Sequence, residues 1–149
     1  MKLHPMKTSA LLQVISAMLI LLFVYTAVSK LLDFEQFKVQ MYNQTLPRQV
    51  STILIWLLPE IELLAASFLF FETTRSYGLY FSFILMFLFT GYIALVLLNY
   101  FGRVPCSCGG VIKTFGWQMH LIFNSFFLLL SLSGIYITNR ERRIYNKEK

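Results

Sequence analysis

Four apolar runs alternate with shorter polar segments along this chain of 149 residues. Each run is close to the roughly 20 residues that a helix needs to cross a hydrocarbon core of about 30 Å. Because lipid offers no partner for backbone N–H and C=O groups, such runs must be helical. We therefore predict an all-α integral membrane protein, a bundle of four spanning helices at about residues 10–28, 53–71, 79–98 and 119–137.

The segment between the first two runs has a helical pattern of its own. Phe34, Phe37 and Met41 recur at helical spacing, with charged and amide side chains between them. This pattern predicts a short amphipathic helix lying at the membrane interface. A lid over a site is the functional alternative.

Composition agrees with a membrane location. The chain is 57% hydrophobic and 13% charged, whereas soluble domains carry about 25% charged residues. The net charge of +6 does not indicate nucleic-acid binding, because five of the thirteen Lys and Arg residues lie in the last ten positions, directly after an apolar run. That arrangement is typical of a basic cytoplasmic flank.

The distribution of basic residues also predicts the orientation. Residues 1–9 and 138–149 become cytoplasmic tails, and the 30–52 and 99–118 loops face outward, in a multi-pass protein of the bacterial inner membrane. The first run is longer than the apolar core of a cleaved signal peptide. We therefore expect it to be retained as the first spanning helix.

The only two cysteines, Cys106 and Cys108, form a Cys-x-Cys pair in the second outward loop. Pro105 and Gly109 supply the bend and the freedom that a small disulfide ring needs. On the periplasmic side the pair meets an oxidising environment, and a strained ring is easily reduced. This favours an exchanging disulfide, with a structural disulfide as the alternative. We predict no metal site, because a zinc site needs four ligands and only His120 lies nearby.

Polar residues in the outer halves of the spans are the other candidates, and Tyr92 in the third span is one of them. Glu60 and Glu62 lie inside the second span beside Pro59, and ionisable groups at that depth are functional hypotheses by default. Side chains two positions apart on a helix point about 200° apart, so only one of the two carboxylates can face the bundle. Lys30 or His120 near the cysteines would favour a thiolate.

Several of these positions resemble the MauE/DoxX-like family of membrane proteins. The segments that carry the resemblance follow one another in the family's order: Tyr25 to Asp33 with Phe37, Leu46-Pro47, Leu58-Pro59-Glu60-Ile61-Glu62-Leu63, Cys106-Ser107-Cys108-Gly109, and Asn124. The resemblance implies a four-helix membrane bundle. For MauE proteins it also implies a place in methylamine utilisation, in which a periplasmic thioredoxin-fold partner and a disulfide-rich dehydrogenase subunit take part.

Two classes of function follow from the residues and the resemblance together. The first is thiol–disulfide exchange with a periplasmic thioredoxin-fold protein, supporting a periplasmic client enzyme. Cys106 and Cys108 would react, while Glu62, Lys30 and His120 would tune or relay protons. The second is a non-catalytic assembly subunit with a structural disulfide. A quinone-linked subunit of the DoxX/DoxD type is a third option, although the sequence contains no quinone motif and firmly implies no cofactor.

Overall fold

In the part of the chain that the computed structural model describes, residues 10–102 and 116–147, every regular element is a helix. The helices are α1 (Ala10–Leu32), α2 (Phe34–Tyr42), α3 (Arg48–Phe70), α4 (Arg75–Leu97) and α5 (Trp117–Lys147). All except α2 are long and apolar enough to span a membrane. The predicted all-α membrane fold is therefore confirmed.

The long helices extend beyond the apolar runs from which they were predicted. α1 continues to Leu32, α3 already begins at Arg48, and α5 reaches Lys147. Polar residues with good helix propensity, such as Arg, Lys and Glu, extend a helix out of the apolar layer at little cost. The basic segment after residue 137 is thus helical as far as Lys147.

Contacts with α4 fix this basic end of α5. Asn139 Nδ2 donates a hydrogen bond to the Tyr80 hydroxyl at 3.1 Å, and Arg142 Nη2 donates one to Ser76 Oγ at 2.8 Å. Both acceptors lie in the first two turns of α4. The beginning of α4 and the end of α5 are therefore held together at the same end of the bundle.

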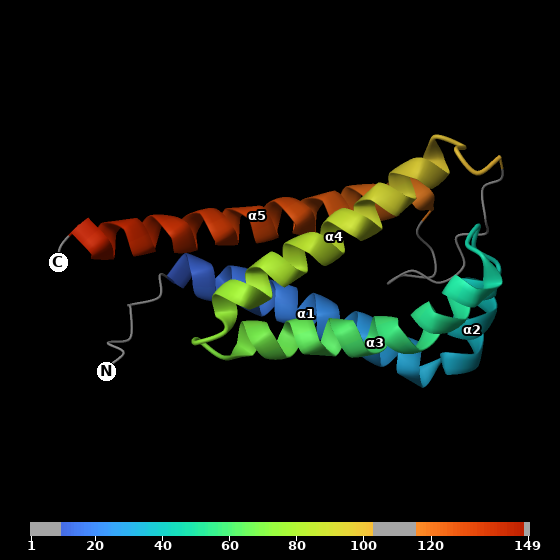
Figure 1. Ribbon diagram of the computed structural model, residues 1–149, viewed down its shortest axis with the longest axis horizontal. Coiled ribbons are helices and arrows are strands. Elements are labelled where there is room, and N and C mark those ends of the chain that lie inside the picture. Colours follow the sequence, from blue (N-terminus) through green and yellow to red (C-terminus); the bar gives the residue numbers. More distant parts are fainter. Residues whose placement is uncertain (1–9, 103–115, 148–149) are drawn as a thin grey trace.

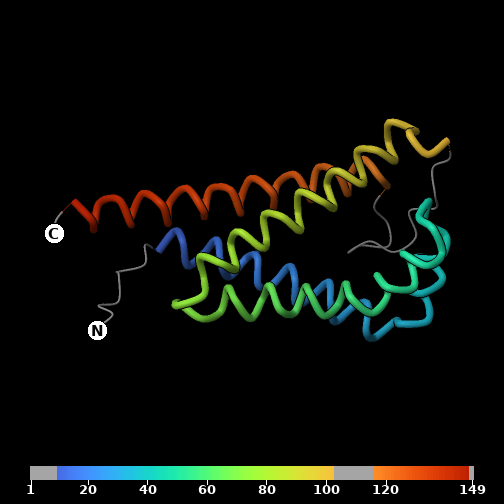
Figure 2. The backbone as a smooth tube through the Cα atoms, viewed as in Figure 1, coloured from blue at the N-terminus to red at the C-terminus, as the bar shows by residue number. Residues whose placement is uncertain are grey.

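The bundle consists of two helix pairs. α1 lies against α3, and α4 lies against α5, while α3 and α4 are joined by the short connection after Phe70 (Figure 1). The tube drawing shows that α4 diverges from α3 away from this connection (Figure 2). α2, the end of α4 and the start of α5 all lie at the opposite end of the molecule, which we call the α2 end (Figure 1).

Two apolar clusters form the core. The larger cluster joins all four long helices through these buried residues: Leu12, Ile15, Leu19, Leu22, Phe23, Ala65, Ala66, Leu69, Leu79, Leu85, Met86 and Phe127. Many other large apolar side chains remain on the outside of the helices, as expected for a surface that faces lipid.

Small residues allow the helices to approach closely. An added Cβ at Gly78 of α4 would lie 2.7 Å from the backbone nitrogen of Leu69 on α3. At Gly134 of α5, an added Cβ would lie 2.8 Å from Leu79 Cδ2. Glycine at such positions is typical of packed membrane helices.

The second cluster holds α2 in place. Phe37 is buried against Ile55 and Leu58 of α3, and Phe34 and Met41 pack around it. The three residues that predicted an amphipathic helix therefore form its packing face. The helix is confirmed, and this face contacts α3.

Candidate functional site

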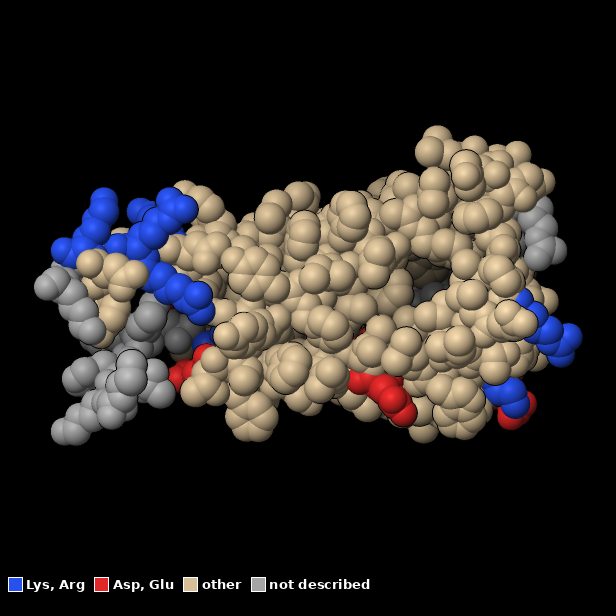
Figure 3. Space-filling model, in the orientation of Figure 1, with Lys and Arg blue, Asp and Glu red and all other residues tan. Residues whose placement is uncertain are grey.

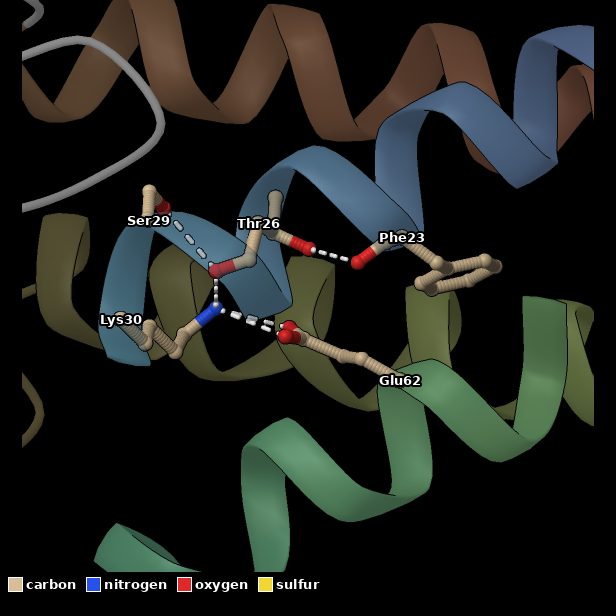
Figure 4. Close-up of polar contacts among 5 residues, drawn as sticks. All are labelled: Phe23, Thr26, Ser29, Lys30 and Glu62. Carbon is tan, nitrogen blue, oxygen red and sulfur yellow. Dashed lines mark hydrogen bonds and ion pairs between the residues drawn. The ribbon is translucent and has the colours of Figure 1, made fainter. Parts of the chain in front are cut away.

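A buried ion pair joins the end of α1 to the middle of α3. Lys30 Nζ lies 2.8 Å from Glu62 Oε1 and 3.0 Å from Oε2, so the ammonium group binds both carboxylate oxygens (Figure 4). The side chain of Glu62 is 3% exposed and that of Lys30 is 20% exposed. Pairing makes the burial of two charges possible in this low-dielectric interior.

The backbone of α1 completes the surroundings of the lysine. Lys30 Nζ also donates to the carbonyl oxygen of Thr26 at 3.3 Å, and Ser29 Oγ donates to the same oxygen at 2.9 Å. The ammonium group has three N–H donors, which match the two carboxylate oxygens and this carbonyl. The Phe37 ring lies 5.9 Å from Lys30 Nζ, measured to the ring centroid, so α2 contributes a cation–π contact.

Residues near Glu62 show how α3 positions this carboxylate. Ile55, Leu58, Pro59 and Glu62 are all buried on one side of the helix. Proline has no N–H, so the carbonyl of Ile55 receives no helix bond from Pro59. α3 nevertheless continues through Pro59 as one helix.

Glu60, two positions before Glu62, lies on the exposed face of α3. The sequence predicted that the two carboxylates would point in different directions, and the structure confirms this. Glu62 is the one that faces the bundle, 2% exposed as a whole residue.

A second polar group connects α4 with the segment between α2 and α3. The Tyr92 hydroxyl donates to Gln44 Oε1 at 3.0 Å and lies 3.1 Å from Thr45 Oγ1. Tyr92 was recognised in the sequence as a polar residue of the outer half, whereas Gln44 and Thr45 were missed. The polar run before Pro47 was the available signal, but its partner is 47 residues away in the chain.

The remaining candidates have varied positions. His120 is buried in the first turn of α5, and Asn124 on the next turn is partly buried. Tyr25 is 53% exposed, and Asp33 is an exposed residue at the N-cap position of α2. Tyr25 therefore faces outward, although it lies within two turns of Lys30.

The cysteine pair lies outside the described residues, as do Pro105 and Gly109. The described helices on either side show where the segment with the cysteines joins the bundle. α4 ends at Leu97 and α5 begins at Trp117, both at the α2 end of the bundle (Figure 1). Among the described residues, no group of three His, Cys, Asp or Glu side chains could hold a metal ion.

These features define a small polytopic membrane protein with a charged pair buried between two of its spanning helices. The family model described as methylamine utilisation protein MauE matches residues 8–137. The chain therefore belongs to the MauE family of membrane proteins associated with methylamine utilisation. No curated protein and no solved structure matches it in the corresponding searches.

Proposed function

We propose that this protein exchanges thiols and disulfides with a periplasmic thioredoxin-fold protein through Cys106 and Cys108. The observation that supports this proposal is topological. The segment that carries both cysteines joins α4 to α5 at the α2 end, and Lys30, in the last turn of α1, pairs with Glu62 in the middle of α3. In this proposal the cysteines act from the end of the bundle toward which α1 runs as it reaches Lys30.

The exchange step is balanced in atoms and electrons. One cysteine thiolate attacks a sulfur of the partner's disulfide, and a mixed disulfide forms as the partner's other sulfur leaves as a thiolate. The second cysteine then attacks the mixed disulfide, which leaves Cys106 and Cys108 oxidised and the partner reduced by two electrons. The reverse sequence oxidises the partner. A periplasmic client enzyme with disulfides would receive or supply the same two electrons.

Replacement of the cysteines tests this reaction. We expect the single variant that keeps the attacking cysteine to trap the mixed disulfide, and the single variant that keeps only the other cysteine to lose it; Cys106→Ser and Cys108→Ser are these two variants. The double variant should form no mixed disulfide, because no sulfur remains to attack. Acid-quenched samples separated on non-reducing gels measure the adduct. Ser107→Ala is the matched control, because it changes the residue between the cysteines and leaves both thiols. Wild-type exchange in the double Ser variant would refute the proposal.

In this proposal Lys30, Glu62 and His120 act on the cysteines as positioning or proton-relay groups. Removing a cation near a thiol raises the pKa of that thiol, and removing an anion lowers it, so Lys30→Met should move the half-maximal exchange rate to higher pH and Glu62→Met should move it to lower pH. The double variant removes both charges of a neutral pair and should shift the profile less than either single variant. The pH profile of single-turnover exchange measures the shift, with Glu60→Gln as a control for the same helix. An unchanged profile would assign a purely structural role to the ion pair.

A membrane assembly subunit with a structural disulfide is the second candidate. The ion pair favours it in one respect: all three donors of Lys30 already have acceptors, as a structural clamp requires. Quantitative thiol alkylation in growing cells separates the two functions. A mixed population of thiol and disulfide supports exchange, whereas complete oxidation supports the assembly role.

A further inference from the structure

The outer face of α3 exposes a carboxylate in the middle of a spanning helix. Glu60 lies 12 residues after Arg48 and 10 residues before Phe70, which corresponds to about 18 Å and 15 Å along the helix axis. The residue is exposed, and its carboxylate has no hydrogen bond or ion pair among the described residues. A glutamate side chain is too short to reach either end of the helix from this depth.

The surroundings of Glu60 on this face are apolar and uncovered. Residues three, four or seven positions away share its side of the helix. They include Ile53 and Trp56, which are 62% and 64% exposed, and Leu57, Leu63 and Leu64, which are 39–46% exposed. Trp56 packs against Phe34 of α2 with ring centroids 5.0 Å apart. We call this surface the Glu60 face.

The described cations of this chain do not reach the Glu60 face. Figure 3 shows basic side chains gathered toward the two ends of the molecule, with acidic atoms exposed between them. Arg48 and Arg75 begin α3 and α4, and the basic residues of α5 lie in its last turns. Lys30 is bound to Glu62, and Lys38 pairs with Glu35 on α2.

We propose that the Glu60 face docks a spanning helix of another membrane protein, and that this helix presents a Lys or Arg to Glu60. An ionised carboxylate facing lipid is costly, and a cation at the same depth removes that cost. The apolar stripe with an exposed tryptophan offers the surrounding contact area. The acid thus selects the partner, and the stripe supplies the packing.

A second copy of this chain fits the face less well. A two-fold contact through the same surface would place one Glu60 opposite the other, because both copies use the same patch. Two carboxylates at that depth repel each other. Lys30 of the second copy would be bound to its own Glu62, and the other described cations would lie toward the ends of that bundle, as they do in the first copy.

Site-specific photo-crosslinking in cells tests the proposal. A benzoylphenylalanine at Leu57 or Leu64, beside Glu60, should form an adduct with a different membrane protein. The same probe at Leu129 on α5, which is 62% exposed, should not. Adding Glu60→Lys should lower the adduct about tenfold or more, because a buried like-charge pair replaces the attraction. The Cys106→Ser/Cys108→Ser background should retain the adduct, so this test is independent of the exchange reaction.

A charge exchange identifies the contact itself. Sequencing of the adduct must reveal a spanning helix with a Lys or Arg, and its replacement by Glu should restore crosslinking to the Glu60→Lys variant. An adduct with twice the 17.4 kDa mass of the chain would assign the face to a second copy and overturn the proposal. Adducts with lipid alone, or an adduct that is insensitive to Glu60→Lys, would also overturn it.

Discussion

A Glu62→Gln variant is expected to lose about 3 kcal/mol of unfolding free energy, because it removes one partner of a buried ion pair. The substitution keeps the size of the side chain, so packing on α3 changes little. Lys30 would remain beside Thr26 and Phe37 without a counter-charge. Unfolding of the purified protein in mixed micelles, driven by an increasing fraction of denaturing detergent, measures the loss.

Two further variants separate the ion pair from other effects. Glu60→Gln makes the same chemical change two positions away on the exposed face, and it should alter the unfolding free energy by no more than about 0.5 kcal/mol. The double variant Lys30→Met/Glu62→Met replaces the pair with apolar side chains and should recover most of the loss. If the double variant is as unstable as the single one, the cost does not come from an unpaired charge.

Gly78→Ala is expected to destabilise the bundle by about 2 kcal/mol, because the added methyl group has no space. Its Cβ would meet Leu69 N at 2.7 Å and the carbonyl carbon of Phe68 at 2.9 Å. These are backbone atoms of α3, so α3 and α4 must move apart to accept the group. The same detergent titration measures the change.

Gly91 on the same helix is the matched control. An added Cβ there meets nothing within 4 Å, so Gly91→Ala should leave the protein unchanged or stabilise it by up to about 1 kcal/mol through better helix propensity. The two substitutions are chemically identical, yet only Gly78→Ala should destabilise the protein. A loss of similar size at both positions would show that close packing at Gly78 is not the cause.

The helices were predictable because their determinants are local. A run of about 20 apolar residues must be helical in lipid, and the spacing of Phe34, Phe37 and Met41 indicated α2. The ends of the helices were less predictable. In the stretch by which α5 extends beyond its apolar run, Asn139 and Arg142 donate hydrogen bonds to α4, and such contacts cannot be read from a hydropathy pattern.

The sequence identified Lys30 and Glu62 as candidate residues, but it did not show that they pair with each other. Lys30 and Glu62 were both recognised as ionisable residues of the spans, yet they are 32 positions apart and their contact depends on how α1 packs against α3. Thr26 was not singled out, because the carbonyl oxygen that accepts from Lys30 and Ser29 carries no signal of residue type. Tyr92 was recognised without Gln44 and Thr45, since a side-chain hydrogen bond between distant segments leaves no periodic signal.

By itself, the sequence determined that this protein has four spanning helices, one short amphipathic helix, a Cys-x-Cys pair and two carboxylates that cannot face the same side. Those features follow from composition, helical period and the polarity of lipid. Only the tertiary structure decided that Glu62 faces inward to Lys30 and Glu60 faces outward. Helix geometry fixes the angle between the two side chains. Which of the two carboxylates faces inward depends on which face of α3 packs against α1.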